Sequence, residues 1–336
     1  MSGDHPSRTR LTRRAFLALP LAAAATMACR WRKPPFVESD FQLPDRSAVG
    51  LFPAADYSVD LADVISRGLA ELSIDVRGRV VLLKPNMVEY EDGHAINTHP
   101  LVVVGAAVAL MRAGASRVLV GEGPGHRRDI EYLLASTGLF DHLRELRVEF
   151  VDLNHDDVRE VQTRSWFTSM RSLTLPSSVL AADLVVSLPK LKTHHWAGMT
   201  CSMKNFFGVV PGAVYGWPKN LLHMKGIDAS ILDIVSTVRP GLTIVDGIVG
   251  MEGDGPIMGR ARPLGFLAMG TDLPAVDATC ARTIGLDPAK VAYLDVARYF
   301  LGNTDQGRIE QRGERPERYR TDFALIDSWR DKRLQL

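Results

Sequence analysis

Short, mostly apolar runs recur along the chain and restrict it to one class of fold. Four of them, residues 80–83, 118–120, 184–188 and 242–245, are rich in valine, leucine and isoleucine. Runs of this length without polar alternation are typical of strands that are buried on both faces. We therefore expect an α/β fold, in which a mostly parallel or mixed sheet has helices on both faces.

Segments with helical periodicity separate these strands. Residues 60–74 place apolar side chains three and four positions apart, as one face of a helix requires. Further helices are expected over residues 101–112, 128–146, 227–238, 275–284 and 291–300. Further strands are expected over residues 148–151 and 264–268, and a long polar and aromatic loop over residues 189–224. The order strand, loop, helix, strand is that of a βαβ unit, which makes neighbouring strands parallel.

Composition excludes several classes of protein. The 336 residues carry a net charge of +1, and this near-neutral balance offers no clustered basic face for nucleic acid. The three cysteines, Cys29, Cys201 and Cys280, form no CxxC pair, so neither a zinc knuckle nor a cysteine-ligated iron–sulfur cluster is expected.

The N-terminal sequence predicts an export signal. Thr12-Arg13-Arg14-Ala15-Phe16-Leu17 fits the twin-arginine pattern, and residues 15–28 that follow are apolar and uncharged. This run is too short for a membrane-spanning helix, which needs about 20 apolar residues. We expect residues 1–28 to engage the twin-arginine translocase and to deliver the protein to a periplasmic or other extracytoplasmic location.

Two outcomes of processing remain open. Thr26-Met27-Ala28-Cys29 resembles a degenerate lipobox, so Cys29 is a candidate lipid anchor, whereas cleavage after Ala28 would release the protein. Residues 29–59 are then expected to form a linker or tether, residues 60–302 the α/β domain, and residues 303–336 a charged, loosely packed tail.

Polar side chains follow the buried strands, at the edge where ligands bind in open α/β sheets. Lys84 and Asn86 follow the first strand, and a cluster ending in His194 follows residues 184–188. Lys190 and Lys192 are two residues apart, so extended backbone would point both the same way and favour an anion. The alternative for such a pair is two solvated surface lysines.

The predicted loop after residue 188 contains more candidates. Lys204 and Asn205 lie among apolar and hydroxyl residues, which makes Lys204 either a base or anion clamp, or a side chain that extends over the following phenylalanines. His223 precedes a helix and is either a proton-transfer group or a structural histidine.

A glycine-rich segment after the strand 242–245 offers carboxylates. Asp246, Glu252 and Asp254 could converge as oxygen ligands of a divalent metal, although the spacing does not match the calcium-hand loop. The alternative is a flexible surface turn rich in glycine and aspartate.

Taken in order, these motifs resemble a known family. They are Lys84-Pro85-Asn86, Asn97-Thr98-His99-Pro100, Gly121-Glu122-Gly123, Pro189-Lys190-Leu191-Lys192-Thr193-His194, Lys204-Asn205-Phe206-Phe207-Gly208, Val245-Asp246-Gly247, Met251-Glu252-Gly253-Asp254-Gly255-Pro256, Gly270-Thr271-Asp272 and Val276-Asp277-Ala278. Over residues 80–293 the chain is similar to the uncharacterised prokaryotic family called domain of unknown function 362. The resemblance implies one α/β domain and favours Lys190, Lys192, His194, Lys204 and Asn205 as site residues. Some members carry a cysteine-rich ferredoxin-like insert, which this chain lacks.

The sequence leaves two hypotheses for function. In the first, the protein is an enzyme for a small anionic substrate: Lys84, Asn86, Lys190, Lys192 and Asn205 bind it, while His194, Lys204 and His223 are catalytic. In the second, the protein is a non-catalytic, membrane-tethered binding protein for an anion, a cofactor or a metal.

Overall fold

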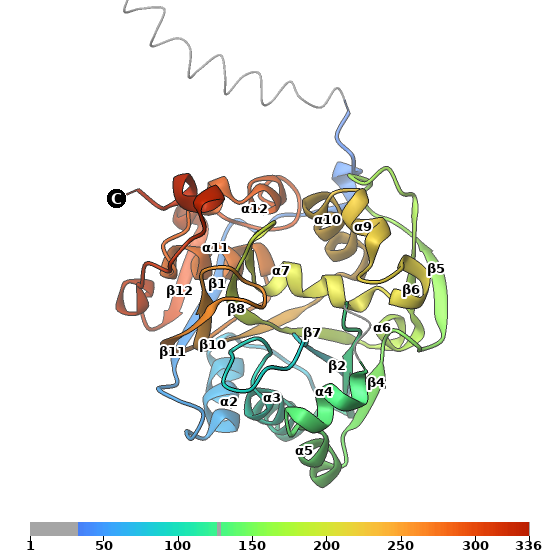
Figure 1. Ribbon diagram of the computed structural model, residues 1–336, viewed down its shortest axis with the longest axis vertical. Coiled ribbons are helices and arrows are strands. Elements are labelled where there is room, and N and C mark those ends of the chain that lie inside the picture. The colour runs from blue at the N-terminus through green and yellow to red at the C-terminus, as the bar shows by residue number, and fades with distance from the viewer. Residues whose placement is uncertain (1–32, 126–128, 336) are drawn as a thin grey trace, which may run out of the picture.

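The computed structural model describes residues 33–125 and 129–335. A ten-stranded sheet forms the middle layer of this domain. The strand order is β12-β1-β11-β10-β7-β2-β3-β4, and β8 and β9 are attached beside β10 (Figure 1). The strands are β1 (Ser47–Pro53), β2 (Val80–Pro85), β3 (Arg117–Glu122), β4 (Glu149–Asp152), β7 (Leu184–Leu188), β8 (Lys190–His194), β9 (Gly198–Thr200), β10 (Leu242–Glu252), β11 (Arg260–Gly270) and β12 (Ile309–Gly313). A separate hairpin pairs β5 (Val158–Gln162) with β6 (Ser172–Pro176).

The central strands run in one direction. β10, β7, β2, β3 and β4 are parallel to one another, whereas β11 is antiparallel to both β10 and β1. The mixed, mostly parallel sheet expected from the apolar runs is thereby confirmed. The carboxyl ends of β2, β3, β7 and β10 consequently share one edge of the sheet.

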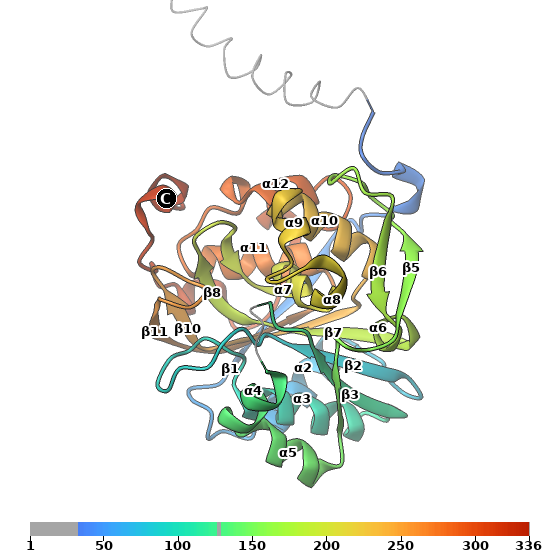
Figure 2. The same ribbon diagram turned by 45° about the vertical axis from the view of Figure 1, so that its right-hand side comes forward.

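Helices cover both faces of this sheet, as expected. Figures 1 and 2 show α2, α3, α4 and α5 on one face and α7, α10, α11 and α12 on the other. The helices are α2 (Leu61–Glu71), α3 (Pro100–Arg112), α4 (Ile130–Ser136), α5 (Leu139–Leu146), α6 (Ser177–Ala181), α7 (Ser202–Asn205), α8 (Gly212–Tyr215), α9 (Asn220–Met224), α10 (Ile227–Val238), α11 (Leu273–Thr283) and α12 (Ala292–Ala297).

The strands read as continuous apolar runs because both of their faces are buried. In β2, Leu82 packs into the core on one side of the sheet, while Val81 and Leu83 pack into the core on the other side. Successive side chains of a strand point to opposite faces, so a strand covered on both sides is apolar at most positions.

The first two helices begin and pack as their sequences require. The Asp60 side chain accepts the Asp63 N–H and caps α2, and the His99 ring accepts the Leu101 N–H and caps α3. Gly105 lets the two helices approach closely, because a Cβ at this position would lie 2.8 Å from Leu61 Cβ.

The expectation of a long loop over residues 189–224 is wrong. This segment contains β8, β9, α7, α8 and α9. β8 lies parallel to β10, with Lys190 opposite Asp246, and antiparallel to β9. The hydrophobic pattern does not predict β8, because this strand contains two lysines and a histidine. These polar side chains are buried only because distant segments supply their partners.

The two ends of the domain also differ from expectation. Residues 29–59 are not only a tether, because β1 lies between β11 and β12 and contributes buried Val49 and Leu51. The tail after residue 302 does not pack loosely: it supplies β12, and Phe323 is fully buried in the core. β12 pairs with a strand more than 250 residues earlier, which local sequence patterns cannot reveal.

A glycine divides the helix expected over residues 128–146. α4 and α5 are separated at Gly138, whose φ of 74° lies in the left-handed region. The proposed signal over residues 1–28 and Cys29 lie outside the described residues. Within the described ranges, none of the helices has the length and apolar character needed to cross a bilayer.

Candidate functional site

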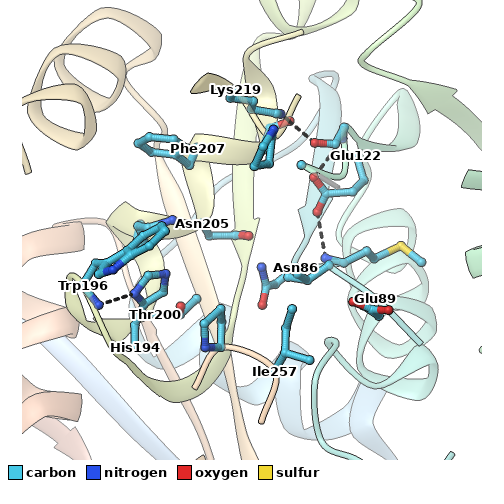
Figure 3. A pocket seen from close by; sticks show the side chains of 18 of the residues that line it. Asn86, Glu89, Glu122, His194, Trp196, Thr200, Asn205, Phe207, Lys219 and Ile257 are labelled. Atoms are coloured by element: carbon cyan, nitrogen blue, oxygen red, sulfur yellow. Dashed lines mark hydrogen bonds between the residues drawn. The ribbon is translucent and has the colours of Figure 1, made fainter. Parts of the chain in front are cut away.

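A cavity of about 500 Å³ opens at the carboxyl edge of the parallel strands. Lys84 and Asn86 reach it from the end of β2, Glu122 from the end of β3, His194 from β8, and Asp254 from the loop after β10. Figure 3 shows Phe207, Trp196 and His194 on one side of this cavity and Glu122, Asn86 and Glu89 on the other. The parallel sheet therefore brings together polar groups that are far apart in sequence.

A buried ion pair between Lys84 and Glu122 forms the floor of the cavity. Lys84 Nζ donates to Glu122 Oε2 at 2.7 Å, to the Pro85 carbonyl at 2.7 Å and to Asn205 Oδ1 at 3.1 Å. Glu122 also accepts the backbone N–H groups of Met87 and Gly123. Burial lowers the pKa of Lys84, while Glu122 acts in the opposite direction.

The segment Lys204–Gly208 lies directly on this ion pair. The Asn205 side chain donates to the Lys84 carbonyl at 2.9 Å and to Ser187 Oγ at 3.1 Å. A Cβ at Gly208 would lie 2.5 Å from Lys84 Nζ and closer still to Glu122 Oε1. The glycine of this motif is therefore needed so that the backbone can approach the ion pair.

Lys204 is a cation that no acid neutralises directly. Asp277 accepts the backbone N–H groups of Ser202 and Met203 and so anchors the start of α7, which carries Lys204. Lys204 Nζ lies 4.3 Å from the centre of the Phe207 ring, and it has no hydrogen bond or ion pair with any residue that the structure describes. Burial, followed by repulsion from Lys84, lowers the pKa of Lys204 to about 8.

His194 and His223 line the same cavity in different tautomers. Nδ1 of His194 accepts the backbone N–H groups of Trp196 and Ala197, so the proton of the neutral ring is on Nε2. Burial and the charge of Lys204 hold the pKa of His194 well below its usual value. Nδ1 of His223 lies 3.1 Å from the Lys219 carbonyl, which can only accept, so this ring carries its proton on Nδ1.

Lys219 was not expected from the sequence, although it lines the cavity. Its side chain is 2% exposed, and Nζ donates to the carbonyls of Gly123 and Gly208. Burial lowers the pKa of Lys219 to about 7, although Glu122 acts in the opposite direction. Lys219 follows Trp217-Pro218 in a short connection, and nothing in that local pattern predicts a buried cation.

Asn86 lines the cavity and carries a buried polar atom that is unsatisfied. Its backbone N–H donates to Thr98 Oγ1, and Thr98 in turn donates to the Leu188 carbonyl. Asn86 Oδ1 is buried and has no hydrogen-bond partner among the described residues. An unsatisfied buried acceptor is costly, and the side chain that carries it belongs to the cavity lining.

Lys190 and Lys192 are both buried in β8 but do not line the cavity. Lys190 Nζ donates to Asp246 Oδ2 at 2.6 Å and to Tyr57 Oη at 2.8 Å. Lys192 Nζ donates to the carbonyls of Ile96 and Pro256, and so joins two loops of the cavity wall. The geometry thus differs from the expected anion clamp, because both ammonium groups are already bound to the protein.

The three carboxylates expected to bind a metal do not converge. Asp246 pairs with Lys190, and Glu252 accepts from Arg260 and the Ala324 N–H. Asp254, with a side chain 58% exposed, lies 3.4 Å from His195 Nδ1. Within the described residues there is no cluster of three or more histidine, cysteine, aspartate or glutamate side chains placed to hold a metal.

Two lysines of the cavity would gain from a bound anion, although the carboxylates of Glu89 and Asp254 also line it. Lys84 and Glu122 neutralise each other, whereas Lys204 and Lys219 line the cavity without a carboxylate at ion-pair distance among the described residues. Lys192 adds a buried amine behind the cavity wall, and after burial itself, repulsion from Lys204 contributes to its lowered pKa. A bound anion would stabilise the charged forms of these lysines.

Comparison with known proteins gives the family. The family model described as "Domain of unknown function (DUF362)" matches residues 81–282, which is more than half of the chain. The chain belongs to the DUF362 family. The matched range contains every residue named above as lining the cavity, including Lys219, which shows that the cavity is part of the DUF362 domain itself.

One curated relative of this DUF362 protein is "Thylakoid-associated protein sll1697" of Synechocystis sp.. It is 33% identical over 223 residues, which are 64% of this chain and 65% of the relative. The chain therefore spans about two thirds of the length of the curated relative that it matches.

Two solved structures are distantly similar to the DUF362 protein. A Thermotoga maritima protein matches at 16% identity and a TM-score of 0.40, over 65% of this chain and 58% of its own. The lactate racemase apoprotein of Thermoanaerobacterium thermosaccharolyticum matches at 13% identity and a TM-score of 0.40, over 66% and 56% respectively. Likenesses this distant say nothing about activity.

Proposed function

We propose that this DUF362 protein is an enzyme that binds a small anionic substrate in the cavity beside Lys204. The observation that carries the proposal is the position of Lys204 Nζ, which lines the cavity, contacts the Phe207 ring and forms no ion pair with the described residues. A cation in such surroundings gains most from an anionic ligand, because the interaction takes place in a poorly solvated environment.

Other groups would orient the substrate. Asn86 lines the cavity, so its side-chain amide is a suitable contact for a polar group of the substrate. The neutral His194 ring carries its proton on Nε2 and can donate to a substrate oxygen, since Nδ1 is occupied by two backbone N–H groups. These contacts position the substrate and need no change in the protonation of the protein.

His223 is the candidate base of this enzyme. Its Nδ1 is held at the Lys219 carbonyl, so Nε2 is the basic nitrogen of the neutral ring. With the charge of the substrate held by Lys204, His223 suits proton abstraction beside a carboxylate or carbonyl group. Removal of such a base typically lowers the rate by 10²–10⁴-fold.

Binding is tested first, by calorimetric titration of the full chain with acetate and with inorganic phosphate. Lys204→Met should abolish binding, because it removes the charge but keeps the unbranched apolar side chain over Phe207. Lys225→Met is the matched control: Lys225 is exposed, lies just after α9 and should not affect affinity. Equal affinity of both variants and the wild type would refute the proposed site.

Catalysis is tested separately by proton exchange. The full chain is incubated with short carboxylic and 2-oxo acids in D₂O, and loss of the α-proton signal is followed by NMR. The enzyme should exchange these protons, and His223→Gln should retain binding but lose the exchange. Binding without exchange for every acid that binds would instead support the alternative, a non-catalytic binding protein.

We propose, further, that the protein is exported by the twin-arginine route. The support is the motif Thr12-Arg13-Arg14-Ala15-Phe16-Leu17 together with the uncharged run over residues 15–28, which begins within the motif. The relative named thylakoid-associated agrees with a location at a membrane surface. Replacing both Arg13 and Arg14 by lysine should retain the protein in the cytoplasm, as checked by cell fractionation, and Cys29→Ser should abolish incorporation of labelled lipid if Cys29 is the anchor.

A further inference from the structure

The cavity is much larger than the anion that its cations require. Its volume is about 500 Å³, whereas one water molecule occupies about 30 Å³ of the liquid. A phosphate or carboxylate group beside Lys204 would leave most of this space unfilled. Cavities of several hundred Å³ with a few polar groups are typical of sites for organic ligands of larger size.

The unfilled part of the cavity has apolar walls. The side chains that line it include Met87, Val88, Phe207, Pro218 and Ile257, which come from the loop after β2, the segment after α7, the connection before α9 and the loop after β10. Figure 3 shows Ile257 on the side of the cavity away from Phe207 and Lys219. An apolar group enclosed by these side chains would be removed from water on several sides.

Apolar side chains also remain exposed where the cavity meets solvent. Trp196 and Met258 both line the cavity, and they are 63% and 75% exposed. The Trp196 backbone N–H is bound to His194 Nδ1, and its ring meets the His223 ring edge to face at 5.6 Å. Single exposed apolar residues are common, but Trp196 and Met258 come from segments about 60 residues apart and both line this cavity.

We propose that the substrate is an amphiphilic anion: a carboxylate or phosphate group that carries an extended apolar chain or ring. Its charged group lies against Lys204, its apolar part fills the space between Phe207 and Ile257, and a longer chain leaves the cavity between Trp196 and Met258. This inference rests on the proposed anion site and names the class of molecule that the site takes.

The test is a series of alkyl phosphates of increasing length, from methyl to octyl, titrated calorimetrically into the full chain below their micelle-forming concentrations. Each methylene that enters the cavity should lower Kd by about fourfold, so butyl phosphate should bind roughly 60-fold more tightly than methyl phosphate. Lys204→Met should abolish binding of the whole series, which separates binding in the cavity from adsorption of alkyl chains elsewhere.

The opening of the cavity is tested with octyl phosphate. The double variant Trp196→Ser, Met258→Ser should weaken octyl phosphate by about tenfold or more but leave methyl phosphate unchanged, because only the long chain reaches these side chains. The control is Phe140→Ser in α5, where a phenylalanine is 52% exposed but remote from the cavity. An equal effect of the control would contradict the proposed path.

The two proposals fail in different ways. If affinity depends on Lys204 but does not change with chain length, the amphiphile is refuted and the anion site stands. If no member of the series binds, or if binding survives Lys204→Met, the anion site is refuted as well.

Discussion

Replacing Gly208 by alanine is the sharpest test of how the cavity floor is built. The added Cβ would lie 2.5 Å from Lys84 Nζ, 2.7 Å from Lys84 Cε and closer still to Glu122 Oε1. A lysine side chain can usually move away from such a contact. Here Lys84 is fully buried, and its Nζ is held by Glu122, the Pro85 carbonyl and Asn205.

The collision must therefore separate the ion pair or displace the backbone. Breaking a buried ion pair typically costs about 3–5 kcal/mol, and overpacking a well-packed site about 1–3 kcal/mol. We expect Gly208→Ala to lower the free energy of unfolding by about 3–5 kcal/mol. That is a large part of the stability of a typical protein, about 5–15 kcal/mol.

The assay is urea-induced unfolding, followed by circular dichroism and tryptophan fluorescence. Gly125→Ala is the matched control in the same cavity, because its Cβ would lie 3.6 Å from the nearest atom, Pro218 Cβ, which is an ordinary contact. This control should stay within about 0.5 kcal/mol of the wild type. Gly208→Ala should also be non-additive with Lys84→Ala, which removes two of the atoms that collide. Gly208→Ala as stable as the control would refute the reasoning.

Three further predictions concern charge and the chain end. Affinity for acetate should fall as pH rises through about 8, because Lys204, whose pKa is lowered to about 8, loses the charge that holds the anion; calorimetry between pH 7.5 and 9 should show this decline, and an affinity that stays constant over this range would contradict the role of Lys204. Lys190→Met should leave acetate affinity unchanged but lower the free energy of unfolding in urea by about 3–5 kcal/mol, because it leaves Asp246 buried without its cation. Deleting residues 303–336 should abolish cooperative thermal unfolding, because the deletion removes β12 and Phe323 from the core. Reduced acetate affinity in Lys190→Met, or an unchanged melting temperature after the deletion, would contradict these predictions.

Several positions in the cavity could be predicted from sequence because they depend on strand ends. Lys84, Asn86 and His194 follow apolar runs, and in a parallel sheet the residues that follow such runs reach one edge. Lys204 and His223, chosen for their surroundings in the sequence, also line the cavity. The hypothesis of one shared opening is supported for these residues.

Other positions could not be predicted, because their roles depend on partners distant in sequence. Lys190 and Lys192 have the spacing of an anion clamp, yet Asp246 neutralises the first and two backbone carbonyls bind the second. Lys219 carries no signal in its local sequence, although it is buried at the cavity. Nor does spacing in a glycine-rich segment show that Glu252 and Asp254 face different partners.

The amino-acid sequence by itself determined the α/β architecture, because the alternation of apolar runs and amphipathic helices follows from local backbone geometry. It also determined which residues leave the parallel strands at their carboxyl ends. Only the tertiary structure decided which lysines are neutralised, that β12 pairs with β1, and that Gly208 lies on the Lys84–Glu122 pair. The physical reason is that electrostatic energy and close packing depend on distance in space, and residues separated by tens to hundreds of positions set those distances.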